Sequence, residues 1–114
     1  MSSITTHILD TTSGRPASGI PVVLERKSQV AGWQTIAEGI TNADGRLNDL
    51  LSVEEPFEVG HYRLNFETGS YFLSRDIECF FPNITISFVV RDPAQHFHVP
   101  LLLSPFGYST YRGS

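Results

Sequence analysis

The sequence contains a single cysteine, Cys79, which rules out a disulfide within the chain. Apolar neighbours such as Ile77 and Phe80 favour a buried, unreactive thiol over a nucleophile. The N-terminus has neither a basic start nor the apolar stretch that would form a secretory signal. We therefore expect a cytoplasmic protein, the alternative being a periplasmic protein whose signal has been removed.

Long apolar runs and an excess of positive charge are also missing. No stretch approaches the roughly 20 apolar residues that a membrane-spanning helix needs. The formal net charge of −4 disfavours nucleic acids and anionic membranes as partners. A chain of 114 residues can bury one core but not two, so we expect a single domain over residues 1–114.

Several motifs that would define a catalytic or metal site are absent as well. The glycines match no phosphate-binding spacing, and no Gly-x-Ser-x-Gly motif supports a serine nucleophile. His96 and His98 share a face of a predicted strand, but the further ligands that zinc requires are missing from the pattern. Residues 42–45 match part of a calcium loop without its final glutamate, so they predict a hairpin turn instead. We therefore expect neither a metal nor a cofactor.

What the sequence does contain is a series of short β-favouring segments separated by turns. This pattern is typical of an all-β sandwich, here with about eight strands. Six strands precede the C-terminal segment, at residues 4–9, 20–26, 33–41, 47–51, 61–67 and 83–91, with a loop at 53–60. In the strand 61–67, alternation places Tyr62, Leu64 and Phe66 on the core side.

One short helix is predicted over residues 71–79. Thr68 or Ser70 can cap its first turn by accepting a free backbone N–H. Leu73 and Ile77, four residues apart, would form its apolar stripe. Pro82 would prevent the helix from continuing.

The segment 95–114 predicts a β-hairpin. Its turn, residues 104–107, has proline and glycine at the positions that a β-turn favours. Leu103 then opposes Tyr108, and His98 opposes Gly113. One face of the hairpin carries His98, Pro100, Leu102, Ser109, Tyr111 and Gly113. An imidazole, a phenol and a bare glycine side by side indicate a site on the surface of a sheet, although a slip of one residue would exchange the two faces.

Three segments resemble the motifs of a known family, the 5-hydroxyisourate hydrolases or transthyretin-related proteins. They are ITTHILDTTSGRPA at residues 4–17, TNADGRL at 41–47 and HFHVPLLLSPFGYSTYRGS at 96–114. The resemblance covers essentially the whole chain, and the terminal Tyr-Arg-Gly-Ser is its most specific part. Phe97 and Phe106 stand where tyrosine is frequent in the family.

The resemblance implies a transthyretin-like sandwich of two four-stranded antiparallel sheets. It also implies a homotetramer, a dimer of dimers, with active sites at the subunit interface along a central channel. The residues that match the family's catalytic groups are His7, Arg46 and His98, and those that match its substrate-binding groups also include Tyr111, Arg112, Gly113 and Ser114. Arg112 falls on the opposite face of the predicted hairpin.

The activity implied is hydrolysis of 5-hydroxyisourate to 2-oxo-4-hydroxy-4-carboxy-5-ureidoimidazoline in urate degradation. His98 would act as the base on water, His7 as its partner or as the proton donor, and Arg46 would bind the substrate's oxygens. The alternative is a carrier that holds small aromatic ligands in the channel without catalysis. A carrier of apolar ligands would not need these imidazole and guanidinium groups together, so the sequence favours the hydrolase.

Overall fold

The computed structural model describes residues 3–52 and 57–114. Residues 1–2, at the N-terminus, and residues 53–56, in the predicted loop 53–60, lie outside the described residues. The elements are β1 (Ile4–Asp10), β2 (Arg15–Pro16), β3 (Pro21–Ser28), β4 (Gly32–Ile40), β5 (Arg46–Leu47), β6 (Gly60–Phe66), α1 (Thr68–Leu73), β7 (Ile84–Val90), β8 (Phe97–Ser104) and β9 (Gly107–Thr110). None of the described helices is long and apolar enough to cross a membrane.

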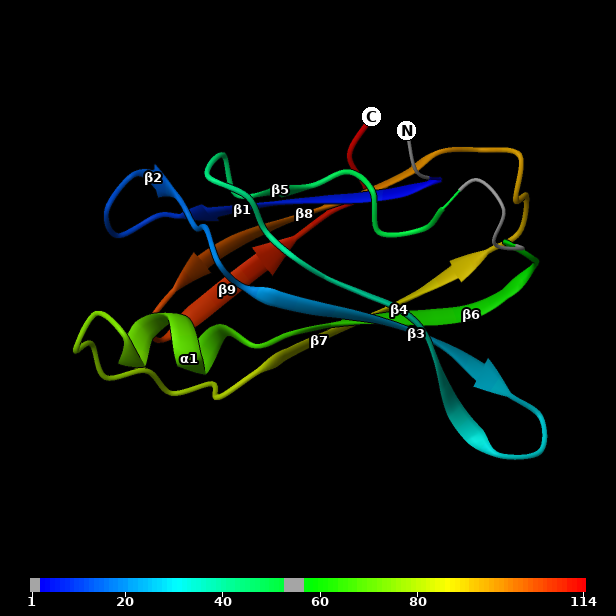
Figure 1. Cartoon of the computed structure of the whole chain (residues 1–114), viewed down its shortest axis with the longest axis horizontal. Coiled ribbons are helices and arrows are strands. Elements are labelled where there is room, and N and C mark those ends of the chain that lie inside the picture. The colour runs from blue at the N-terminus through cyan, green and yellow to red at the C-terminus, as the bar shows by residue number, and fades with distance from the viewer. Residues whose placement is uncertain (1–2, 53–56) are drawn as a thin grey trace.

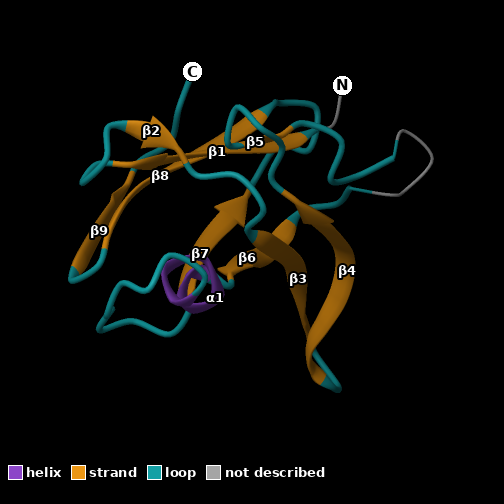
Figure 2. Ribbon diagram, turned by 60° about the vertical axis from the view of Figure 1, so that its left-hand side comes forward, coloured by secondary structure: helices purple, strands orange, loops and turns teal. Residues whose placement is uncertain are grey.

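The strands form two sheets that stack into a sandwich, which confirms the all-β prediction. The first sheet has the order β2-β1-β8-β9, with β5 also paired to β1, and the second has the order β4-β3-β6-β7. Figure 1 shows the first sheet above the second, with α1 at one end, and Figure 2 shows the two layers from the side. The expected all-antiparallel pairing is wrong at one place, because β1 and β8 run parallel. The chain crosses between the sheets before β8, so the two strands enter the sheet from the same end.

The core lies between the sheets and follows the alternation of the strands. In β6, Tyr62, Leu64 and Phe66 are at most 1% exposed, as predicted. From the first sheet, Ile4 and Ile8 of β1 are fully buried. Burial of one such side chain stabilises the fold by about 1.5–3 kcal/mol. The core between the sheets therefore fixes the first sheet and the position of the side chains on its outer face.

The β8–β9 hairpin has the register that its turn predicts. Leu103 pairs with Tyr108 and Ser104 with Gly107, and an isolated bridge joins His98 to Gly113. Phe97, Val99, Leu101 and Leu103 are all buried, so the other face of β8, with His98, is turned outward. The predicted division into a core face and a mixed outer face is therefore confirmed for β8.

The tight turn before β5 forms as predicted, but it does not join a two-stranded hairpin. The N–H of Gly45 donates to the carbonyl of Asn42 at 2.9 Å, and Gly45 has a φ of +71°. The strands on either side belong to different sheets, since β4 pairs with β3 and β5 pairs with β1. The predicted strand 47–51 is shorter than expected, because only Leu47 continues β5 before the chain leaves the sheet with Leu50 and Leu51 still buried.

The helix lies earlier in the chain than the predicted 71–79, and it buries different residues. Leu73 is 79% exposed, whereas Tyr71 and Phe72 are buried, so the predicted stripe is wrong. No side chain caps the first turn, where Glu67 holds the N-cap position, and so the predicted cap at Thr68 or Ser70 is also wrong.

The end of the helix explains why it is short. Asp76 has a positive φ of 57° and donates its N–H to the carbonyl of Leu73, while Ile77 donates to that of Phe72. This is the hydrogen-bond pattern of a Schellman motif with aspartate in the left-handed position. Cys79 follows this stop and is half-buried rather than buried, with its Sγ 3.6 Å from the carbonyl oxygen of Phe81.

Candidate active site

The register of the first sheet brings His7, Arg46 and His98 to one outer surface. His7 of β1 pairs directly with Arg46 of β5, and Thr5, two residues before His7, pairs directly with His98 of β8. Residues paired across neighbouring strands share a face, and so do residues two apart on one strand. Three chain segments that the sequence separates by up to 91 positions therefore meet on the side of the first sheet that faces away from the core.

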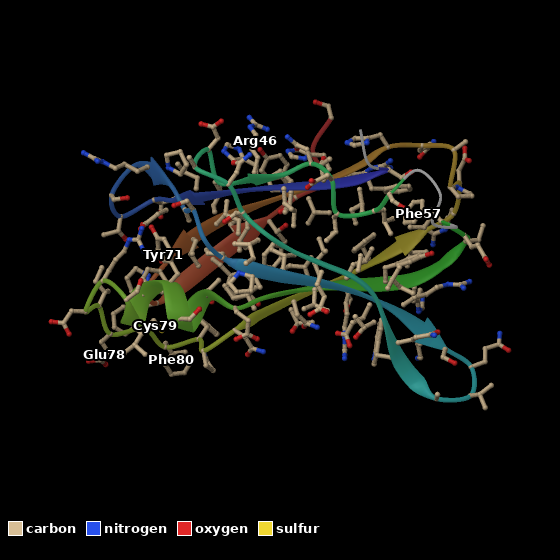
Figure 3. The ribbon with its side chains drawn as sticks, in the orientation of Figure 1. Arg46, Phe57, Tyr71, Glu78, Cys79 and Phe80 are labelled. Carbon is tan, nitrogen blue, oxygen red and sulfur yellow. The ribbon has the colours of Figure 1, made fainter. Side chains whose placement is uncertain are left out.

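Arg46 is held at this surface by the turn that precedes it. Its N–H donates to Oδ1 of Asn42 at 3.0 Å, and that same oxygen accepts from the N–H of Asp44 at 2.9 Å. Leu47, the next residue, points into the core, so alternation turns Arg46 outward. Figure 3 shows the Arg46 side chain above β5, away from the second sheet.

Two imidazoles, those of His98 in β8 and of His96 just before this strand, share one hydroxyl. Oγ1 of Thr5 lies 2.8 Å from Nδ1 of His98 and 3.0 Å from Nε2 of His96. Thr5 is only 4% exposed, while His98 is half-buried and His96 is exposed. A buried hydroxyl on the neighbouring strand β1 thus fixes the orientation of the His98 ring.

Gly113 fixes the same ring from the side. Its N–H donates to the carbonyl of His98 at 2.8 Å. A Cβ at this position would stand 2.5 Å from Cδ2 of His98 and 3.3 Å from Cγ of Pro100. Only a residue without a side chain lets the C-terminal segment lie against the imidazole in this way.

The surroundings of His98 favour its neutral form. Burial lowers the pKa of His98, and the neighbouring positive groups Arg46, His96 and His7 lower it further, against a smaller opposing effect of a backbone hydrogen bond at Thr5. A neutral imidazole that keeps one nitrogen unprotonated can accept a proton from water, so this position suits a general base.

The chain forms a shallow hollow at this surface. It measures about 330 Å³ and is lined by Thr5, Arg46, Asn48, His96, His98 and Ser114. Its lining combines a permanent cation, two imidazoles, two hydroxyls and an amide, which can bind an anionic or strongly polar small molecule and move protons on it.

Not every predicted residue lines this hollow. His7 is paired with Arg46 on the same face of the sheet but is not one of the lining residues. Arg112 points elsewhere, as the predicted register implies: Nη2 donates to Oε1 of Gln95 at 3.0 Å, and its guanidinium lies 4.6 Å from the ring centroid of Phe97. Tyr111 is 59% exposed and, like Arg112, borders a hollow of about 240 Å³ between β7 and β9. Gly113 and Ser114 lie beside His98 and in the hollow, respectively.

The sequence did not identify Thr5, His96 and Asn48 as members of this surface. The sequence pattern suggests His96 only as half of a possible zinc pair, and its hydrogen-bonded neighbour, Thr5, lies 91 positions away. Only the parallel pairing of β1 and β8 reveals that contact. Within residues 3–52 and 57–114, no group of three or more His, Cys, Asp or Glu side chains could hold a metal ion.

Comparison with known proteins finds a family and several relatives for this chain. Residues 4–113 match the model of the HIUase/Transthyretin family. A 5-hydroxyisourate hydrolase of Salmonella dublin is 47% identical over 111 residues, which cover 97% of this chain and 80% of that protein.

Solved structures agree with this placement. The structure of Klebsiella pneumoniae 5-hydroxyisourate hydrolase superposes with a TM-score of 0.85 at 41% identity, covering 97% of this chain and 98% of that one. Sea bream transthyretin, solved in complex with thyroxine, gives a TM-score of 0.91 at 31% identity, covering 98% and 95%. The fold is thus shared by relatives whose names indicate a hydrolase and by one that binds a hormone.

Proposed function

The chain belongs to the HIUase/Transthyretin family, as the resemblance of its motifs predicted, and on that premise we propose that it hydrolyses 5-hydroxyisourate. The observation that carries the proposal is that strand pairing puts His7, Arg46 and His98 on one face of the first sheet, where Arg46 and His98 line the hollow. The reaction opens the six-membered ring at its N1–C6 amide by addition of water and yields 2-oxo-4-hydroxy-4-carboxy-5-ureidoimidazoline.

His98 is the base in this proposal. Its lowered pKa keeps the ring neutral near pH 7, so Nε2 can take a proton from the water that attacks C6. Among the described residues, the His98 ring makes one hydrogen bond, from Nδ1 to Thr5, and Nε2 has no hydrogen-bond partner. This nitrogen is therefore available to a water molecule in the hollow.

Arg46 and His7 act on the carbonyl oxygen and the leaving nitrogen. When water adds to C6, negative charge develops on the carbonyl oxygen, and the guanidinium of Arg46 stabilises it with two N–H donors. His7, directly beside Arg46 on β1, supplies the proton that the ring nitrogen needs when the C–N bond breaks. Tyr111, Gly113 and Ser114 would shape the pocket, and Arg112 would contribute only through its neighbours.

We also propose that the active form is a homotetramer, a dimer of dimers, with its sites at the interface between copies. The hollow of one chain is shallow and Tyr111 is largely exposed, so a facing copy would cover the substrate. The chain would act as a single domain over residues 1–114 in the cytoplasm, where a free thiol such as Cys79 stays reduced.

The test is the decay of freshly prepared 5-hydroxyisourate, followed by ultraviolet absorbance. We expect the protein to accelerate this decay in proportion to its concentration. A carrier would instead bind an aromatic ligand and leave the decay rate at its value in buffer, and that result would overturn the proposed function. Sedimentation of the same sample tests the tetramer separately.

A further inference from the structure

The Thr5 hydroxyl bridges His98 and His96, and neither Thr5 nor His96 has a role in the proposed reaction so far. It reaches Nδ1 of one ring at 2.8 Å and Nε2 of the other at 3.0 Å. Thr5 is 4% exposed, so bulk water does not compete for its oxygen. A hydroxyl has one proton and two lone pairs, so it can donate to only one of these nitrogens.

If both rings are neutral and both contacts are hydrogen bonds that run in one direction through Thr5, the protons can be arranged in two ways. In the first, Nδ1 of His98 donates to Thr5 and the Thr5 hydroxyl donates to Nε2 of His96. In the second, His96 donates to Thr5 and the hydroxyl donates to Nδ1 of His98, which places the His98 proton on Nε2. Only the first arrangement leaves Nε2 of His98 with the lone pair that a base needs.

From this geometry we infer that Thr5 is a positioning residue, which holds His98 as its Nδ1–H tautomer, and that exposed His96 is the group to which a proton can pass through Thr5. This inference rests on the proposed function, because it assigns the two residues to the hydrolytic step. The groups that face His98 are Arg46 of β5, His7 of β1 and His96, which directly precedes β8. All three oppose a positive charge on the ring.

The proton movements balance without a further reactant. As the oxygen of water bonds to the carbonyl carbon, its O–H bond breaks and the proton bonds to Nε2 of His98. The proton on Nδ1 passes to Oγ1 of Thr5 while the proton of that hydroxyl passes to Nε2 of His96. His98 ends neutral with its proton on Nε2, and the positive charge ends on His96, which is exposed to solvent.

The tautomer is measured directly by ¹H–¹⁵N correlation of histidine-labelled protein above the pKa of His98, without substrate. We expect the His98 ring to carry its proton on Nδ1 in the natural protein and in Thr5→Ser, which keeps the hydroxyl. In Thr5→Val, a substitution of nearly equal size, this preference should be lost. A proton on Nε2 of His98 in the natural protein would overturn the inference.

Kinetics supply the second readout. Thr5→Val should lower kcat about 10-fold to 10²-fold with KM unchanged, a smaller effect than the ~10²–10⁴-fold contribution of the base itself. Thr5→Ser should stay within about threefold, because serine provides the same donor and acceptor. His96→Ala, at an exposed position that the fold does not depend on, should lower kcat about 10-fold.

Thr6→Val is the matched control. It also removes a buried hydroxyl from β1, one that donates to the carbonyl of Val99 at 2.6 Å on the opposite face. It should lower the unfolding temperature while kcat per folded molecule stays the same. Unchanged kcat in both Thr5→Val and His96→Ala would overturn the inference. Inactivity of the natural protein would instead overturn the proposed function, and the ¹H–¹⁵N spectra would still decide the tautomer of His98.

Discussion

Two polar clusters share strand β1, and they differ in whether their polar atoms are fully bonded. At the end near α1, Asp10 is 3% exposed: Oδ2 accepts from the Tyr71 hydroxyl at 2.8 Å, and Oδ1 accepts from the N–H groups of Thr12 and Ser13. On the outer face, His98 uses Nδ1 and leaves Nε2 without a partner among the described residues.

The difference separates a structural group from a reactive one. Burial and the neighbouring Asp10 carboxylate raise the pKa of Tyr71 to about 12, so its hydroxyl keeps its proton and remains a donor. A cluster whose donors and acceptors are all bonded holds α1 and the loop after β1 against the sheet. A cluster with an unbonded nitrogen beside a cation can still bind a ligand and exchange a proton with it.

The largest expected effect is on activity. His98→Asn should lower kcat at least about 10²-fold, because the amide cannot accept a proton from water. The free energy of unfolding should change little, since the ring is only half-buried. Kinetics of 5-hydroxyisourate decay and chemical denaturation of the same sample check this, and near-normal turnover would remove His98 from the catalytic groups.

The second prediction concerns the bonded cluster. Tyr71→Phe should lower the free energy of unfolding by about 1.5–3 kcal/mol, because it removes a hydrogen bond to a buried carboxylate. Turnover per folded molecule should stay normal. Tyr108→Phe is the control, since Tyr108 is 42% exposed and its hydroxyl makes no hydrogen bond within the described residues. Equal stability of the two variants would show that the bond at Asp10 contributes nothing.

A third prediction tests the contact between Gly113 and the His98 ring. Gly113→Ala would place a methyl group 2.5 Å from Cδ2, so the ring or the C-terminal segment must move. We expect kcat to fall about 10-fold to 10²-fold, as misplacement of a catalytic group does. Gly107→Ala, whose new methyl would meet only Oγ of Ser104 at 3.7 Å, should keep full activity. Equal activity of the two variants would contradict the packing argument.

The smallest effect is a shift in pH dependence. Since the base must be neutral, kcat/KM should fall as the pH drops through the pKa of His98, and this acid limb should lie below the ordinary histidine value of 6.5. Salt screens the exposed Arg46 and His96, so higher ionic strength should move the limb upward. A limb above 6.5, or one that salt moves downward, would contradict this electrostatic account.

The sequence predicts the local part of this architecture well. The turn at residues 104–107 determines which residues of β8 and β9 face each other, and Leu103 and His98 have the predicted partners. Alternation also assigns Tyr62, Leu64 and Phe66 correctly to the core. In both cases the information lies within a few neighbouring residues.

What depends on distant contacts could not be predicted from local pattern. The parallel pairing of β1 with β8 joins segments more than 90 positions apart, and the Thr5 bridge follows from it. The helix lies earlier than its local pattern predicts. Tyr71 is buried with its hydroxyl bonded to Asp10, 61 positions away, and the periodicity of the helix does not reveal this contact. The resemblance to a family identified His7, Arg46 and His98 as one site, which spacing alone does not.

The most direct test of the central claim is a double-mutant measurement of kcat/KM. If His7 and His98 act on one substrate in one reaction, His7→Asn and His98→Asn together should cost about as much as the worse of the two alone. Losses that simply multiply would mean that the two imidazoles act independently, and would contradict the shared site on the outer face of the first sheet.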